Sequence, residues 1–241
     1  MSIQFGDDTS YLIYAQSVAA DLAQKTVFLR LSIDGIQADN FPNLFITKND
    51  NATVGFYLGY YGHASDLALE WKAFFSGTDG VWRVNSTTLT VGTRYTIAVA
   101  YDNSLTTNDP VIYINGVSQT VTETATPTGT SGSDASSYLV FSSAGVSGYE
   151  FYGKLEQALI YNRILSAGEI LDIHNSRKAI PDWRGLVFAP HLCGAAGVTP
   201  FNGAVLGTSN TIKDLVSGAA GAPTGSPIGR ADTYLDFEGI H

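Results

Sequence analysis

Large apolar side chains recur at every second position in one stretch near the middle of the chain. In 94–102 they run from Tyr95 to Tyr101 and alternate with smaller or polar residues. This period of two is typical of a β-strand that buries one face and leaves the other smaller or more polar. The pattern predicts a strand over 94–102.

The next stretch predicts a hairpin. Residues 111–114 are β-branched or aromatic, which favours a strand. They lead into Asn115 and Gly116, a pair that tolerates positive φ at both central positions of a type I′ turn. We therefore expect 117–122 to be the returning strand. Asp, Asn, Ser, Thr and Pro fill 102–110, so a turn is expected between the first two strands.

A strand followed by a capped helix is predicted further along the chain. Residues 155–161 form an apolar strand pattern. Ser166 and Glu169 then have the spacing of a capping box, in which each residue satisfies a backbone N–H of the other. Ile170 and Ile173 share one face of the helix that follows. A short helix is unusual in a chain whose other patterns all indicate strands.

Together these patterns resemble the laminin-G-like, concanavalin A-like jelly-roll family. The resemblance extends from residue 2 to about residue 175 and rests on four stretches: 2–12, 94–102, 113–116 and 153–170. It implies an all-β fold, namely a concanavalin A-like (laminin-G-like) jelly-roll sandwich of two antiparallel sheets with one short helix near 166–175.

The end of the chain resembles the beginning of such a domain. Three stretches resemble the strands with which laminin-G-like domains open: 185–190, 210–218 and 234–239. We expect 1–178 to form the sandwich and 179–241 to supply opening strands, either to the same sandwich or to a neighbouring copy with an open sheet edge. Closure within the chain is favoured because it costs less entropy than ordering a free arm. A separate small domain is disfavoured because 199–227 is rich in Gly and Ala.

Composition narrows the choice of partners. With 241 residues the chain can form one large sandwich, or one domain with an extension. A net charge of −9 and scattered Lys and Arg disfavour binding to nucleic acid or to an anionic membrane. Cys193 is the only cysteine, so no internal disulfide forms.

No membrane span or classical secretion signal is expected. The N-terminus has no basic patch followed by an apolar stretch, and no run approaches the roughly 20 apolar residues of a membrane span. An extracellular location then implies either release without a signal, as for a virion component, or earlier removal of a signal.

The sequence contains no common catalytic motif. It has no G-x-S-x-G elbow, no phosphate-binding loop, no H-E-x-x-H zinc helix and no C-x-x-C pair. Jelly-roll glucanases place several acids at alternate positions of one strand, and no such acidic ladder occurs here. We therefore expect a protein that is not an enzyme and that requires no cofactor.

Calcium is the one metal that the family resemblance suggests. Relatives often bind it through loop acids and backbone oxygens, and Asp7, Asp8 and Asp102 lie in or near predicted turns. Asp8 matches an acid of the family's opening pattern and is the first candidate ligand. The alternative is that these acids serve only as turn residues.

Aromatic residues suggest a ligand-binding surface. In 56–61, Tyr57 and Tyr61 alternate with residues of the opposite face. With Trp71 or Trp82 they are candidates for an exposed platform on which sugar rings stack. The alternative is that these aromatics pack beneath a sheet. The long loop at 123–137, rich in Thr, Ser and Gly, is either a contact loop or simply solvated.

The primary hypothesis is a non-enzymatic surface or structural binding module. A laminin-G-like domain of this simple kind resembles those found in bacteriophage virion proteins, including capsid decoration and tail-associated proteins. The resemblance implies a virion surface location and contacts with other copies, with other virion proteins and with host glycans. The alternative is a secreted or extracellular polysaccharide-binding accessory domain, or a glycoside-active enzyme.

Overall fold

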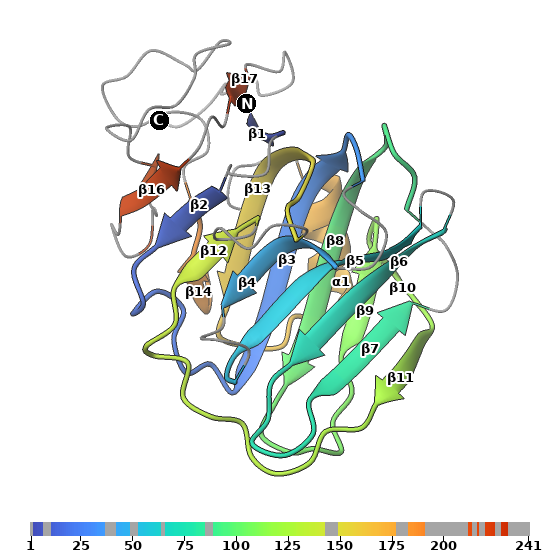
Figure 1. The fold of residues 1–241 in the computed structure, drawn as a ribbon, viewed down its shortest axis with the longest axis vertical. Coiled ribbons are helices and arrows are strands. Elements are labelled where there is room, and N and C mark those ends of the chain that lie inside the picture. Colours follow the sequence, from blue (N-terminus) through green and yellow to red (C-terminus); the bar gives the residue numbers. More distant parts are fainter. Residues whose placement is uncertain are drawn as a thin grey trace.

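The computed structural model describes residues 2–6, 11–36, 42–48, 53–63, 66–84, 89–142, 149–176, 183–190, 212–213, 216, 220–224 and 228–230. Across these residues two antiparallel sheets face each other, and one helix packs on the outer side of one sheet (Figure 1). The prediction of an all-β sandwich with two antiparallel sheets and one short helix is confirmed.

The first sheet contains most of the long strands that the sequence predicted. Every pairing in it is antiparallel. In hydrogen-bonding order its strands are β10 (Val117–Ser118), β9 (Val111–Ile114), β8 (Arg94–Asp102), β3 (Gln24–Ile33), β13 (Gly153–Tyr161), β1 (Ser2–Phe5) and β17 (Ile228–Arg230), with β14 (Leu186–Phe188) also pairing with β13.

The second sheet is also antiparallel throughout. Its strands are, in order, β11 (Val121–Ala125), β7 (Gly80–Val84), β6 (Asp66–Ala73), β5 (Phe56–His63), β4 (Asn43–Lys48), β12 (Leu139–Phe141), β2 (Tyr11–Tyr14), β16 (Ala220–Thr224) and β15 (Ile212–Lys213).

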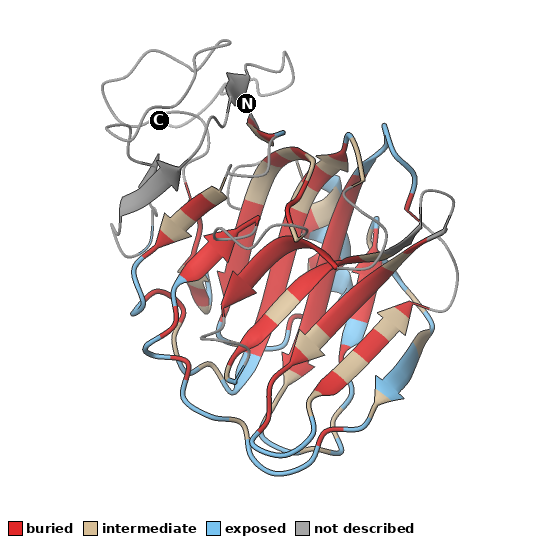
Figure 2. Cartoon of the chain, viewed as in Figure 1, coloured by how far each residue is buried: buried red, intermediate tan, exposed pale blue. Residues whose placement is uncertain are grey.

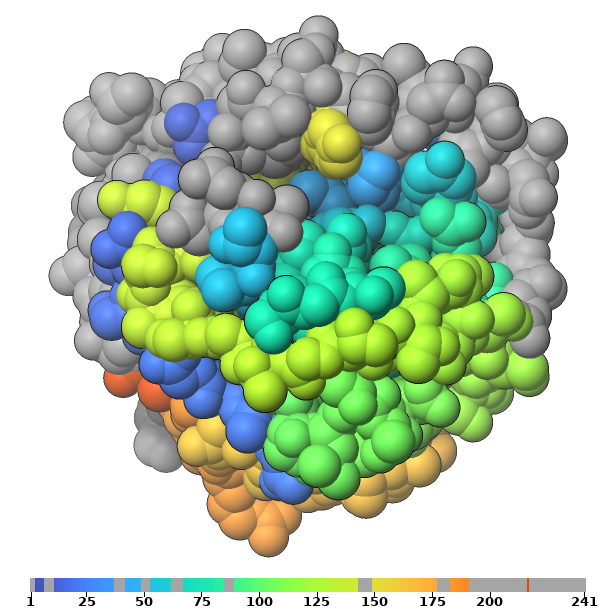
Figure 3. All heavy atoms as spheres, turned by 60° about the horizontal axis from the view of Figure 1, so that its bottom comes forward, coloured from blue at the N-terminus to red at the C-terminus, as the bar shows by residue number. Residues whose placement is uncertain are grey.

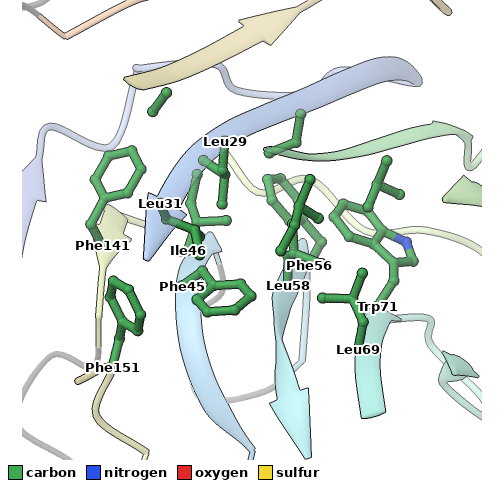
Figure 4. Close-up of a cluster of buried hydrophobic side chains, with 14 of the residues drawn as sticks. Leu29, Leu31, Phe45, Ile46, Phe56, Leu58, Leu69, Trp71, Phe141 and Phe151 are labelled. Atoms are coloured by element: carbon green, nitrogen blue, oxygen red, sulfur yellow. The ribbon is translucent and has the colours of Figure 1, made fainter. Parts of the chain in front are cut away.

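The main core fills the space between the two sheets. Large apolar side chains from both sheets meet there, among them Leu29 and Leu31 of the first sheet and Leu58 and Trp71 of the second (Figure 4). Central strands are buried along most of their length, whereas the edge strand β11 is largely exposed (Figure 2). Each fully buried large side chain contributes about 1.5–3 kcal/mol, so this core is the main source of stability.

The predicted hairpin is confirmed at its turn and corrected after it. Asn115 has φ 51° and Gly116 has φ 78°, as a type I′ turn requires. The returning strand, however, is only β10, because the ladder stops after Ser118. Residues from Val121 onward form β11, which pairs with β7 in the other sheet. The expected single strand over 117–122 is therefore wrong.

The helix α1 (Ala167–Asn175) builds a second, smaller core on the outer side of the first sheet. Ser166 and Glu169 form the predicted capping box. Ile170 and Ile173 are buried against residues of β3, β8 and β13. The helix thereby covers a sheet face that would otherwise be open to water.

Strands of the C-terminal segment pair with strands of the sandwich. Phe188 of β14 is fully buried in the main core, while β16 pairs with β2 and β17 pairs with β1. The predicted stretch 234–239 lies outside the described residues. Whether the segment completes its own sandwich or a neighbouring copy in solution stays a prediction.

Helix length also bears on membrane insertion. In the part of the chain that the structure describes, α1 is a helix of nine residues, and no helix is long and apolar enough to cross a bilayer.

Candidate functional site

The two tryptophans proposed for a ligand platform lie in the core. Trp71 is 0% exposed and Trp82 is 1% exposed. They sit opposite each other on β6 and β7, and the Trp71 ring stacks on Phe56 with centroids 4.8 Å apart. The prediction that either tryptophan forms an exposed sugar platform is therefore wrong. The physical reason is strand alternation, which places Trp71 on the same inner face as Leu69.

The two tyrosines of the same prediction point away from the core and are partly exposed, so their role in ligand binding stays a prediction. Tyr57 and Tyr61 lie on the outer face of the second sheet, which is the face turned away from the first sheet. The Tyr57 hydroxyl donates to Glu70 Oε1 at 2.5 Å, and its ring packs edge-on against Phe74. The Arg83 guanidinium lies 4.3 Å from the centre of the Tyr61 ring.

These contacts form a polar group that we call the outer-face cluster: Tyr57, Tyr61, Glu70 and Arg83. Glu70 and Arg83 are register partners on β6 and β7, and Arg83 Nε donates to Glu70 Oε2 at 2.5 Å. Glu70 is only 2% exposed, so both of its oxygens are occupied within the cluster. Burial, reinforced by the Glu70 carboxylate, raises the pKa of the Tyr57 hydroxyl above its ordinary value.

A polar hollow lies at one end of the sandwich, where the four segments that follow β2, β6, β8 and β11 meet. We call it the rim cleft. It has a volume of about 340 Å³, within the size range of small-molecule sites. In Figure 3 the yellow-green segment after β11 crosses the molecule between the teal residues after β6 and the green loop after β8. The polar residues that line the rim cleft include Asp21, Asn103, Thr106, Ser131, Ser133 and Asp134.

One wall of the rim cleft is tied to the turn after β6. The backbone N–H of Ser76 donates to the Thr130 carbonyl at 2.9 Å, and the N–H of Gly77 donates to the Thr128 carbonyl at 3.1 Å. Gly129 has φ 88°, a left-handed conformation that favours glycine. These bonds fix the backbone that presents Ser131 to the cleft.

The other walls are joined by reciprocal bonds between two aspartates. The Asp21 N–H donates to Asp134 Oδ1 at 2.7 Å, and the Asp134 N–H donates to Asp21 Oδ1 at 3.0 Å. Burial raises the pKa of the Asp134 carboxyl, although the Asp21 N–H opposes this shift. Asn103 Nδ2 donates to Ser131 Oγ at 2.7 Å and bridges the remaining sides. The cleft therefore has a preformed set of hydroxyl, amide and carboxylate groups.

Asp102 lies beside the rim cleft and caps the turn after β8. Its carboxylate accepts from the Ser104 N–H at 2.9 Å and from Gln24 Nε2 at 3.0 Å. The Ser104 bonds, followed by the Gln24 bond, lower the pKa of this carboxyl. These contacts match the turn role that the sequence offered as the alternative to calcium binding.

The structure brings no cluster of metal ligands together in the part of the chain that it describes. Among these residues no three His, Cys, Asp or Glu side chains lie close enough to hold an ion. The other two calcium candidates, Asp7 and Asp8, lie outside the described residues. Calcium binding through Asp7, Asp8 and Asp102 stays a prediction.

Sequence reasoning named Tyr57 and Tyr61 of the outer-face cluster but missed Glu70 and Arg83, and it missed the pair of aspartates in the rim cleft. Glu70 and Arg83 are 13 positions apart, and only the register of β6 and β7 makes them neighbours. Asp21 and Asp134 are 113 positions apart. The one usable signal was the long polar loop, whose Ser131 and Ser133 do line the rim cleft.

Across the described residues the chain is thus a sandwich of two antiparallel sheets with a polar cleft among the loops at one end. The chain belongs to the concanavalin A-like lectin/glucanases superfamily, because a laminin-G family model with that description matches residues 8–171. The family predicted from the sequence motifs is confirmed.

The solved structures with a similar fold include those of the following two proteins. A candidate carbohydrate-binding protein from Bacteroides ovatus matches with a TM-score of 0.61 and 17% identity, over 98% of this chain and 61% of that protein. This chain thus corresponds to less than two thirds of that protein's length. A heptameric SAP-like pentraxin from Limulus polyphemus matches with a TM-score of 0.52 and 14% identity, over 92% of this chain and 94% of the pentraxin. No curated protein matches the sequence.

Proposed function

We propose that this protein is a non-enzymatic binding module whose rim cleft binds glycans. The observation that carries the proposal is the preformed hollow of about 340 Å³ lined by hydroxyl, amide and carboxylate groups. Sugars offer many hydroxyls that both donate and accept, so they are complementary to such a lining. The carbohydrate-binding-like lectin fold supports this ligand class, although fold alone does not define a function.

The setting that we propose is a virion surface. The support for this setting is the resemblance of the sequence pattern, with its single cysteine, to laminin-G-like domains of capsid decoration and tail-associated proteins, which contact other copies or other virion proteins. A secreted or extracellular binding protein is the alternative. No cofactor is required in this proposal, and calcium is an optional ligand of the turn acids.

A glycan array, read with and without calcium, tests the proposal. We expect binding to a defined set of neutral glycans. Replacing Asn103 by Ala should weaken that binding about five- to tenfold, because one hydrogen-bonding side chain of the cleft is lost. Thermal melting of the variant checks that the fold is kept.

The matched control is Gln119→Ala, which removes an amide side chain that does not line the cleft and that, among the described residues, bonds the Val117 carbonyl. This variant should bind like the wild type. Absence of glycan binding in both calcium conditions would overturn the proposal. Release of reducing ends from a bound polysaccharide would instead establish the glycoside-active alternative.

A further inference from the structure

The outer-face cluster holds one arginine in a fixed position. Arg83 Nε donates to Glu70 Oε2 at 2.5 Å. The other oxygen of Glu70 accepts from the Tyr57 hydroxyl at 2.5 Å, and Glu70 is almost fully buried. The carboxylate that orients the guanidinium is therefore itself held by a second bond.

The guanidinium is also supported on one face. Its carbon lies 4.3 Å from the centre of the Tyr61 ring, which is cation–π geometry. Rotation of the arginine is thus opposed by Glu70 at Nε and by Tyr61 below. A guanidinium held in this way loses little conformational freedom when it binds a ligand.

Neither terminal Nη group of Arg83 bonds a residue that the structure describes. Within the described part of the chain, the contacts of Arg83 involve its Nε and its ring-facing surface. Its side chain is 36% exposed, whereas that of its partner Glu70 is 3% exposed. The end of the guanidinium that carries both Nη groups is a two-pronged donor that fits the two oxygens of a planar acid.

The charges around this donor favour a carboxylate over a doubly charged phosphate. Glu70 already neutralises much of the Arg83 charge. The nearest lysine along the same strand as Glu70, Lys72, is paired with Asp79 at 2.9 Å. A group with one negative charge and two coplanar oxygens gains both hydrogen bonds and meets less repulsion from Glu70 than a dianion does.

We propose that Arg83 is the anchor of a second binding site that takes the carboxylate group of an acidic ligand. The site lies on the outer face of β5, β6 and β7 and shares no lining residue with the rim cleft. It therefore does not depend on the glycan-binding proposal. A carboxylate can come from an acidic sugar or from an acidic amino acid, and the two sources are separated by experiment.

The test compares three probes on the full chain by NMR titration: D-glucuronate, its methyl ester, and N-acetylglutamate α-amide. We expect glucuronate to bind about tenfold or more tightly than the uncharged ester, because two charge-assisted hydrogen bonds are lost with the charge. The Arg83 Nε–H signal should shift during the glucuronate titration. Equal affinity for glucuronate and N-acetylglutamate α-amide supports a site that recognises the carboxylate group alone. A higher affinity for glucuronate supports an acidic sugar as the ligand.

Two arginine variants complete the test. Arg83→Lys keeps the positive charge but removes the paired Nη donors of the guanidinium, and it should reduce the affinity for glucuronate about tenfold. Arg94→Lys is the matched control, since Arg94 is also an exposed arginine paired with a glutamate, Glu156, but on the first sheet. It should leave affinity unchanged.

The proposal is overturned if ester and acid bind equally well to the wild type, a result that does not depend on any variant folding. It is equally overturned if Arg83→Lys binds glucuronate like the wild type. Asn103→Ala should not affect the acid-to-ester ratio, so loss of rim-cleft binding and loss of this site are distinguishable.

Discussion

Lys25 is a buried lysine at the end of the main core. Its side chain is 3% exposed, and its amine lies 5.8 Å from the centre of the Phe56 ring and 5.9 Å from that of Tyr101. Burial lowers the pKa of Lys25 to about 8, although Asp134 and Asp102 oppose this shift. A charged amine here costs stability, since its hydration is lost and only part of that loss is offset.

Replacing Lys25 by Met should therefore stabilise the protein at pH 7, by on the order of 2 kcal/mol. In the wild type the unfolded chain holds this proton up to about pH 10.5, but the folded chain releases it near pH 8. The wild type thus gains stability above pH 8, so its deficit relative to the variant should shrink as pH rises. Urea unfolding at pH 6.5, 8 and 9.5 measures this difference.

The matched control for Lys25 is Lys72→Met. Lys72 is partly exposed and paired with Asp79, so its replacement should give no gain in stability. A Lys25→Met variant that is less stable than the wild type at pH 7 would show that the contacts of the amine with the two rings and the nearby acids outweigh its desolvation.

Single residues were predictable where alternation alone decides the outcome. The alternation in 56–61 correctly separates Tyr57 and Tyr61 from the buried Phe56 and Leu58, although it left open which of the two sets packs in the core. Trp71 follows the same alternation, since Leu67, Leu69 and Ala73 are buried on its face of the strand. Its predicted role as an exposed sugar platform, however, was based only on the chemistry of the indole ring. Chemistry suggests a ligand contact, but the strand period decides whether the side chain can reach one.

The helix α1 shows how much of an element local sequence can specify. Ser166 Oγ accepts from the Glu169 N–H at 3.3 Å, and Glu169 Oε2 accepts from the Ser166 N–H at 2.8 Å. The other end is held by tertiary contacts that local sequence does not reveal. There Arg30 of β3 donates to the carbonyls of Ile173, His174 and Ser176.

The Ser166→Ala variant should lower the free energy of unfolding by about 1 kcal/mol, because the helix loses its N-cap acceptor. Hydrogen bonds from Arg163 and Ser166 hold the pKa of Glu169 at about 2, well below its ordinary value of 4.5. The stability that Glu169 contributes is present above pH 4.5 and is lost as the pH falls towards 2. Chemical unfolding at pH 7 and pH 3 measures both effects.

Ser118→Ala serves as the control for the cap, since Ser118 is exposed on β10 and caps no helix. An unchanged stability of Ser166→Ala would mean that packing of Ile170 and Ile173 alone maintains the helix.

Strands and turns were predictable where neighbouring residues in the sequence determine them. They were not predictable where pairing with a strand that is distant in the sequence determines their bounds. Strand β8 has the bounds that its alternation predicted, and the turn at Asn115 and Gly116 has the expected backbone. The end of β10 and the start of β11 were missed, because the choice between two sheets depends on whether β9 or β7 is the neighbour. The rim cleft was out of reach for the same reason, since its walls come from separate loops.

At the scale of the whole molecule, the C-terminal segment contributes to both the core and the sheet edges. The Phe188 ring lies 4.9 Å from the ring of Tyr14 and 5.9 Å from that of Phe141. Strands β16 and β17 pair with β2 and β1, which would otherwise be open edges. The segment therefore has two separable effects, one on packing and one on edge protection.

Two variants separate these effects. Phe188→Ala should lower the free energy of unfolding by about 3–5 kcal/mol without causing association, because it leaves a core cavity while the edges stay covered. A chain that ends at residue 210 keeps Phe188 and loses β15, β16 and β17. It should associate, because the open edges of β1 and β2 can pair with another copy.

Light scattering and thermal melting of both variants and the full chain measure association and stability. A monomeric full chain together with an associating truncated chain establishes closure within the chain. An oligomeric full chain that becomes monomeric on truncation establishes strand donation between copies, since the segment then supplies the contact that its removal abolishes.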